Sequence, residues 1–300
     1  MPPKGSGAVT RSDLFRCYQE GWEHEWLNRV DADLWPSDAG YRAILEAILD
    51  LLGPLSGERL RLLDVGCGVG IYTIHYLRRF PAARAVGVDL SLPQLRTAAD
   101  LSRRYGMGDR ARFLQGDAES LGVRGPYDLV VCSEVIEHLL DPARALCGLR
   151  AVCSPVARVI LTVPQIYGDA GAEGTFYRFQ GSDGAWIETQ NAACVPADGT
   201  VFRYVHRQFD LASLSNLVEG SGFRIRRVRG VRFKVPLRLV GGFRGGAAFA
   251  RRARNAAARF VNACAVVLPE RMLHGCTGLR FAETLVVECV PAGSVAAERA

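Results

Sequence analysis

The chain has 300 residues, of which 49% are hydrophobic, and a formal net charge of +6. This length and apolar content are enough for one large domain, or for one core domain with insertions, and they disfavour two full domains. No apolar run reaches the roughly 18 to 20 residues that span a bilayer, and the N-terminus lacks the apolar stretch of a signal peptide, so we expect a cytoplasmic protein.

The N-terminal segment carries aromatic side chains at helical spacing. Phe15, Tyr18, Trp22 and Trp26 follow one another at intervals of three, four and four residues, which places them on one face of a helix. Packing against the core explains such a stripe most simply, and the functional alternative is a lid that closes over a binding site and excludes water. We interpret segment 1–58 as a helical lid segment.

The stretch from Leu62 to Gly70 reads LLDVGCGVG. An apolar run before alternating glycines indicates a buried parallel strand that enters a tight turn, where a ligand can approach a backbone that has no Cβ atoms in the way. Ile71, Ile74 and Leu77 then repeat at helical spacing. The turn is therefore expected to open into a helix whose N-terminus favours an anion.

The spacing of these glycines disfavours two common nucleotide sites. A nicotinamide or flavin fingerprint needs G-x-G-x-x-G, and counted from Gly66 its third glycine would fall on Ile71. A phosphate-binding P-loop needs a lysine after the glycines, and the chain's lysines, Lys4 and Lys234, lie far from the loop. A nicotinamide oxidoreductase is therefore a weaker interpretation.

Strands and helices alternate after the glycine loop. This alternation is typical of a doubly wound α/β fold, in which helices cover both faces of a mostly parallel sheet. A helix is expected from Ser91, a plausible N-cap, with Pro93 in its first turn. The other strands are expected at residues 84–90, up to 116, 127–133 and 157–164, with a last hairpin-like pair at 223–233 and 280–290.

We expect a single domain with insertions. Long segments that interrupt a regular sheet usually shape the substrate side. The expected parts are the lid segment 1–58, a cofactor-binding core at 59–164, a substrate-side insertion at 165–208, and the C-terminal part of the core at 209–300 with a basic insertion at about 231–276.

The cysteines do not indicate a metal site. The chain has nine of them and no C-x-x-C pair. Free thiols in a reducing compartment explain this pattern better than zinc, so no metal is expected.

Four motifs follow one another at the ends of successive strands. They are Asp64–Gly70, Gly87–Asp89, Gly116–Ala118, and the segment from Tyr127 to Leu139 with its EVIEHL ending. In this order they resemble the motifs of class I S-adenosylmethionine (SAM)-dependent methyltransferases, including the ubiquinone-biosynthesis type, over about one third of the chain. The resemblance implies a seven-stranded, mostly parallel, Rossmann-like sheet and SAM as cofactor, with S-adenosylhomocysteine (SAH) as product.

The resemblance also implies which residues hold the cofactor. Asp89 would accept hydrogen bonds from the ribose hydroxyls, Asp117 would take the adenine amino group, and Ala118 would lie beside the ring. Because SAM has no phosphate, the loop only needs to offer bare backbone to its aminoacyl arm and ribose. The expected cofactor residues are Asp64, Gly66, Cys67, Gly68, Gly70, Asp89, Leu90, Asp117, Ala118, Ser133 and Glu134.

Two histidines are the candidates for catalysis. Methyl transfer needs alignment first, and a proton acceptor only if the nucleophile holds its proton tightly. His138 follows the fourth strand, where related enzymes that methylate hydroxyls often carry an acid or a histidine, and His206 resembles a histidine before the last large helix of such enzymes. The alternative interpretations are that His138 supports a helix start and that His206 is a packing residue.

Aromatic side chains suggest the acceptor. Tyr18, Trp22, Tyr177 and Trp186 are expected on the substrate side, and an aromatic pocket suits a flat or apolar molecule. We therefore expect methylation of a hydroxyl on a small, partly apolar acceptor, in bacterial secondary metabolism. The alternatives are N- or C-methylation, a lipid or quinone acceptor, and a protein that binds SAM without transferring methyl.

The C-terminal third is unusually basic. Twelve Arg or Lys side chains and no acidic residue lie between Glu219 and Glu270. Segment 224–259 could therefore contact an anionic membrane surface or an acidic carrier, with an ordinary surface helix as the alternative. No nucleic-acid recognition motif accompanies these arginines, so a nucleic-acid partner is not expected.

Overall fold

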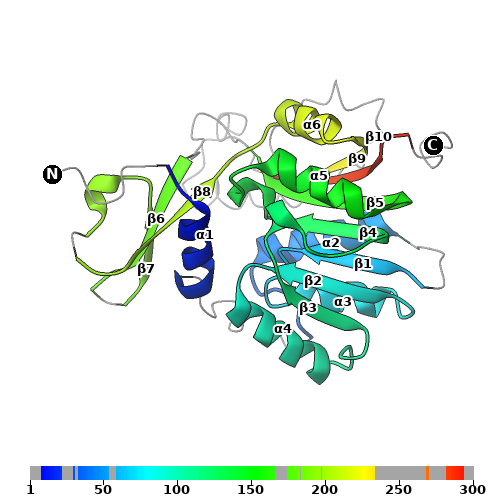
Figure 1. The fold of residues 1–300 in the computed structure, drawn as a ribbon, viewed down its shortest axis with the longest axis horizontal. Coiled ribbons are helices and arrows are strands. Elements are labelled where there is room, and N and C mark those ends of the chain that lie inside the picture. The colour runs from blue at the N-terminus through cyan, green and yellow to red at the C-terminus, as the bar shows by residue number, and fades with distance from the viewer. Residues whose placement is uncertain are drawn as a thin grey trace, which may run out of the picture.

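The computed structural model describes residues 8–21, 30, 33–53, 59–165, 174–182, 184–196, 198–233, 268–269 and 282–293. Its main body is a sheet of eight strands in the order β10-β9-β11-β5-β4-β1-β2-β3, covered by helices on both faces (Figure 1). The strands are β1 (Arg61–Val65), β2 (Arg84–Asp89), β3 (Ala111–Gln115), β4 (Tyr127–Ser133), β5 (Cys153–Pro164), β9 (Phe223–Phe233), β10 (Leu268–Pro269) and β11 (Ala282–Pro291).

The first five strands run parallel. β1 lies between β2 and β4, so that Val65 pairs with Val88 on one side and with Cys132 on the other. β11 runs antiparallel between β5 and β9. The predicted seven-stranded, mostly parallel sheet and its closing antiparallel pair are thus confirmed, and the two-residue β10 adds a short edge strand that the sequence did not indicate.

Alternate residues of the strands face two separate apolar clusters. On β4, Val130 and Cys132 pack with α5 (Pro142–Val152) and α6 (Leu211–Gly220), whereas Leu129 and Val131 pack with α2 (Ala39–Leu52) and α3 (Ile71–Arg79). This period-two alternation is what a strand buried on both faces requires. α2 belongs to the expected lid segment; it packs on the sheet, and its Tyr41 also lines the cavity described below.

The helices begin where capping side chains stand. α4 (Leu92–Arg104) starts after Ser91, whose hydroxyl accepts from the backbone N–H of Gln94, and Pro93 occupies its first turn, as predicted. Asp38 caps α2 in the same way, through the backbone N–H groups of Gly40 and Tyr41. Local sequence therefore fixes where these helices begin.

The insertion after β5 builds a second, smaller sheet. Its strands β6 (Gly174–Gln180), β7 (Trp186–Thr189) and β8 (Val201–His206) pair antiparallel in the order β7-β6-β8. The short helix α1 (Arg11–Arg16) and the π-helical turn Cys17–Gly21 pack against this sheet, and Figure 1 shows α1 between it and the main body. The sequence indicated an insertion here, but not its strands.

Arginines in the described part of the basic stretch form ion pairs within the fold. Glu288 is fully buried on β11 and forms ion pairs with Arg158 and Arg227, and Arg229 pairs with Asp50. These pairs stabilise the β9 edge of the sheet. Residues 234–259 lie outside the described part, so the predicted membrane or carrier contact of segment 224–259 stays a prediction. In the described residues, no helix is long and apolar enough to cross a membrane.

Candidate cofactor and acceptor site

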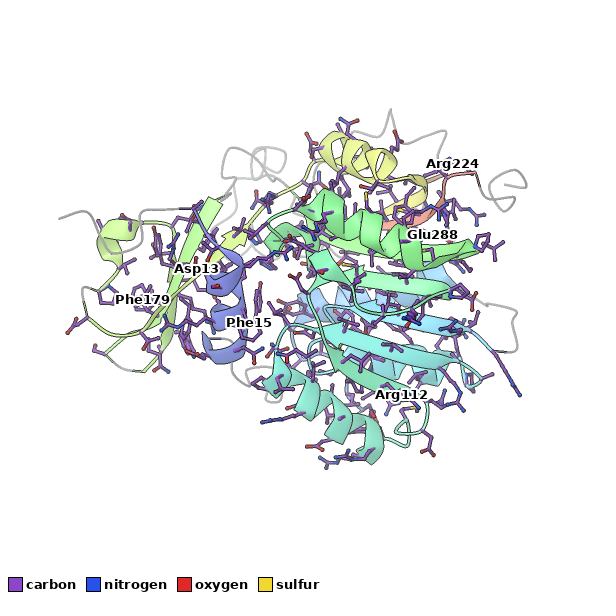
Figure 2. The ribbon with its side chains drawn as sticks, in the orientation of Figure 1. Asp13, Phe15, Arg112, Phe179, Arg224 and Glu288 are labelled. Atoms are coloured by element: carbon purple, nitrogen blue, oxygen red, sulfur yellow. The ribbon has the colours of Figure 1, made fainter. Side chains whose placement is uncertain are left out.

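A cavity of about 700 Å³ lies at the carboxyl ends of the parallel strands. Open α/β sheets bind ligands at this edge. The glycine loop after β1 forms its floor, and Leu14 and Phe15 of α1 and Tyr204 of β8 line the opposite side. Figure 2 shows Phe15 between the small sheet and the main sheet. Segments that are far apart in the sequence, α1 near the N-terminus and β8 after residue 200, thus enclose one site with the glycine loop.

The glycine loop folds tightly over the end of β2. The backbone N–H groups of Gly66 and Cys67 both donate to the carbonyl of Val88, over 2.7 and 3.1 Å. Gly66 has a φ of +71°, and a Cβ atom placed there would lie 2.1 Å from Cγ2 of Val135. Only glycine can adopt this conformation in so little space.

Asp89 ties the loop to the next helix. Its Oδ2 accepts from the N–H of Gly68 and its Oδ1 from the N–H of Ser91, both over 2.8 Å. Burial raises the pKa of this carboxyl, and the backbone N–H groups of Ser91, Gly68 and Leu90 oppose that shift. Each oxygen keeps a second lone pair, so the carboxylate can still accept hydrogen bonds from a ligand's hydroxyls.

Asp64 lies beneath the loop at the end of β1. It is 2% exposed, and the hydroxyl of Thr73 on α3 donates to its Oδ2. Burial, together with the smaller effect of the nearby Asp89, raises the pKa of Asp64 to about 7, against the effect of the Thr73 hydrogen bond. A cation beside Asp64 would restore its charge.

Helix α1 reaches the site through Arg11. Its guanidinium lies 3.5 Å from Oδ2 of Asp117 and 3.0 Å from Oε2 of Glu119. Asp117 caps a short 3-10 turn, Ala118–Ser120, through the N–H of Glu119. Arg11 therefore links α1 to the residues expected to hold the adenine.

The end of β4 carries a backbone in an unusual conformation. Glu134 has a φ of +54°, which is uncommon for a residue other than glycine. Thr162 of β5 holds it there: its Oγ1 donates to Oε1 of Glu134 over 2.8 Å and accepts from the N–H of Glu134 over 3.0 Å. Such strained residues cluster at functional sites.

The structure brings nearly all the expected cofactor residues together. All of them line the cavity except Gly70, which caps α3 with a φ of +74°. A Cβ atom on Gly70 would lie 2.9 Å from that of Ala98 and 3.0 Å from the ring of Phe113, so this glycine is required for packing beneath the loop.

His138 lines the cavity, and its Nε2 lies 3.8 Å from Oε1 of the buried Glu137, whose pKa is raised by burial. Nδ1 of His138 lies 3.0 Å from the carbonyl of Val205, which can only accept, so Nδ1 carries the proton and Nε2 carries the lone pair. Burial and the neighbouring His206 lower the pKa of His138 to about 4, against the effect of the Val205 carbonyl. The ring is therefore neutral at pH 7.

Aromatic rings surround His138. The ring of His206 lies 5.2 Å from it, that of Tyr204 5.9 Å and that of Tyr18 6.3 Å, and all four residues line the cavity. This side of the cavity is walled by flat side chains.

Two of the other expected substrate residues do not line the cavity. Tyr177 and Trp186 are on the small sheet and are not among the residues that line the cavity. Trp186 packs against Phe202, and the guanidinium of Arg178 lies over its ring at 4.6 Å. Trp22 lies outside the described residues. The roles proposed for these three residues remain predictions.

Several residues at the site were missed by sequence reasoning. Arg11 is one, and Gln19 is another: its side chain donates to the carbonyl of Leu90 and accepts from the N–H of Leu92. Glu137 is buried beside His138, and its Oε2 has no hydrogen-bond partner among the described residues. Their partners are mostly distant in the sequence, so no local pattern could have revealed them, although the EVIEHL segment already contained Glu137.

The chemistry of the lining fits a cationic cofactor. Arg11 contributes the one guanidinium among the described lining residues, which otherwise carry many carboxyls. SAM brings a sulfonium and an ammonium, which these carboxyls can compensate. In the described part of the chain, no group of three or more His, Cys, Asp or Glu side chains is arranged to hold a metal ion. The acidic residues of the lining are Asp64, Asp89, Asp117, Glu119, Glu134, Glu137 and Glu188.

Known proteins resemble this chain in sequence. Malonyl-[acyl-carrier protein] O-methyltransferase of Magnetococcus marinus is 38% identical over 96 residues, which are 32% of this chain and 34% of the relative. Ubiquinone biosynthesis O-methyltransferase of Aeromonas salmonicida is 33% identical over 120 residues, which are 39% of this chain and 48% of the relative. The chain thus spans less than half the length of these two relatives.

Solved structures share the fold. The complex of DhpI with SAH superimposes with a TM-score of 0.53 at 14% identity, covering 93% of this chain and 94% of that one. The CcbJ methyltransferase from Streptomyces caelestis gives 0.53 at 12% identity, covering 84% and 90%. At these identities the likeness concerns the fold alone.

The family is established by a longer match. Residues 38–228, more than half of the chain, match the family described as Methyltransferase domain. The match runs from the N-cap of α2 into β9 and includes the glycine loop and every parallel strand that borders the cavity. The chain therefore belongs to the class I SAM-dependent methyltransferases, which take their methyl group from SAM and release SAH.

Proposed function

We propose that this protein methylates a hydroxyl group of a small, partly apolar or aromatic acceptor, with His138 as the proton acceptor. The observation that carries the proposal is the hydrogen bond from Nδ1 of His138 to the carbonyl of Val205, because it leaves the lone pair on Nε2, which lies 3.8 Å from Oε1 of Glu137, in a ring that lines the cavity. The names of the O-methyltransferase relatives support an oxygen acceptor.

The reaction needs few protein groups. SAM supplies a methyl group that its positive sulfur already activates. The acceptor oxygen forms a bond to this methyl carbon while the carbon–sulfur bond breaks, and Nε2 of His138 takes the hydroxyl proton. The electron pair of the broken bond stays on sulfur, so SAH leaves as a neutral thioether. His206 and Tyr204 would position the acceptor beside the base.

The acceptor is expected to be a small molecule with a flat apolar part. Leu14, Phe15, Leu139 and Tyr204 line the acceptor side, so an apolar body would be desolvated there. The acidic lining would disfavour an anionic group near the sulfur. A place in bacterial secondary metabolism remains part of this proposal.

An acceptor screen with a matched pair of variants tests the role of His138. The purified protein is incubated with methyl-labelled SAM and a panel of phenols, alcohols and amines. In His138→Asn the amide nitrogen can keep the hydrogen bond to Val205, but the position of Nε2 is empty. Turnover should fall about 100- to 10,000-fold while SAH affinity stays unchanged.

The control is His75→Gln, which alters a buried histidine outside the cavity, bonded to the carbonyl of Leu34. It should leave turnover close to that of the wild type. The loss in His138→Asn should also shrink with acidic phenols, which need less help to lose a proton. Unchanged turnover in His138→Asn would refute the assignment, and labelling of amines alone would move the function to N-methylation.

A further inference from the structure

Packing alone does not explain why a hydroxyl group is buried at Thr73. Thr73 is fully buried in the first turns of α3, beside the apolar Ile74 and Leu77. A threonine inside a helix usually bonds back to a carbonyl of the preceding turn, but this hydroxyl donates to Oδ2 of Asp64 on β1. Valine has the same shape without the hydroxyl, so packing alone does not explain a threonine here.

The hydroxyl of Thr73 stabilises the charged form of Asp64. Among the described residues, Thr73 provides the one hydrogen bond to the Asp64 carboxylate, which is almost completely buried yet lines the cavity. A buried carboxylate needs a donor or a cation to stay charged. The hydroxyl provides the donor, and it also fixes the direction in which the second oxygen points.

The cation for Asp64 has to come from the ligand. Arg11 is the one arginine or lysine among the described lining residues, and it is held by Asp117 and Glu119. The Thr73–Asp64 pair joins α3 to the end of β1, on either side of the glycine loop, whereas Arg11 lies beside Asp117 after β3. The cofactor carries one ammonium, on its amino-acid arm.

We infer that Thr73 is a positioning residue of the cofactor site: its hydroxyl holds the carboxylate of Asp64 so that it pairs with the ammonium of SAM and SAH. Thr73 acts through Asp64 and does not itself touch the ligand. Its contribution therefore appears only with ligands that carry the amino-acid arm.

Two ligands separate this role from a structural one. SAH has the arm, whereas 5′-methylthioadenosine keeps the adenine, the ribose and the sulfur but lacks it. Calorimetric titration of Thr73→Val should show about tenfold weaker SAH binding, the effect of one hydrogen bond to a charged group, and unchanged methylthioadenosine binding. Thr73→Ser keeps the hydroxyl and should restore most of the SAH affinity.

A double variant keeps the test decisive. Asp64→Asn should show the same selective loss, and adding Thr73→Val to it should cause no further loss, because the two residues act in series. Equal weakening of both ligands in Thr73→Val, unchanged SAH affinity, or additive losses in the double variant would each overturn the inference. If Thr73→Val fails to fold, Thr73→Ser and Asp64→Asn decide the question through the same two ligands.

Discussion

The affinity for SAH should fall as the pH drops below 7, because Asp64 has to lose a proton before it can pair with the ammonium. Burial raises the pKa of Asp64 to about 7 in the free protein, and pairing with the ammonium lowers it. Only the ionised fraction binds. The apparent affinity is then about twofold weaker at pH 7 and about elevenfold weaker at pH 6, or about 1.4 kcal/mol, than at high pH.

Calorimetry between pH 5.5 and pH 7.5 measures this coupling. SAH is the suitable ligand because its amine stays protonated over this range. Titrations in two buffers with different ionisation enthalpies count the protons released, which should be about half a proton per SAH at pH 7 and about 0.9 at pH 6. A constant affinity over this range would refute the reasoning.

Asp64→Asn is the control, because asparagine has the same shape and does not titrate. Burial also raises the pKa of Asp89, so this carboxyl can contribute to the pH profile of SAH affinity. Asp64→Asn shows the contribution of Asp89 alone. An identical pH profile in the variant would assign the effect to Asp89. The other ionisable groups that face Asp64 stay neutral in this range, because burial raises the pKa of each of them: Cys67, Tyr72, Tyr76 and Cys132.

Three further outcomes follow from the site. Asp89→Ala should weaken SAH and methylthioadenosine equally, by about 1–3 kcal/mol in calorimetry, since both carry the ribose; a loss for SAH alone would contradict this. Gly66→Ala places a Cβ 2.1 Å from Val135 and should lower the melting temperature, and Val135→Ala should recover part of the loss. Arg11→Ala should speed SAH dissociation in stopped flow by about two- to tenfold, whereas the exposed Arg16→Ala should not.

Much of the cofactor half could be predicted because its signals are local. The apolar run before Asp64 and the glycines after it specify a strand and a turn within a few residues. The same holds for Ser91 and Pro93, which start α4. Parallel strands bring their carboxyl ends to one edge, so residues that end successive strands meet without any further information.

The acceptor side of the cavity could not be predicted in the same way, because its structure depends on contacts between segments that are distant in the sequence. Trp186 was predicted to be a substrate residue because aromatic side chains are common in pockets, and this role stays a prediction; the guanidinium of Arg178 over its ring is a tertiary contact that the prediction did not include. The small sheet was not predicted, since its antiparallel register is set by pairing between strands and by packing against α1.

By itself the sequence determined the fold class, the cofactor loop and the carboxylates that border it, because each is encoded by neighbours in the chain. The tertiary structure decided which of these groups have a shifted pKa, and in which direction. Arg11 meets Glu119 from 108 residues away, and the proton on His138 is placed by the Val205 carbonyl, 67 residues away. Charge state and tautomer depend on burial and on partners across the fold, and no local pattern contains them.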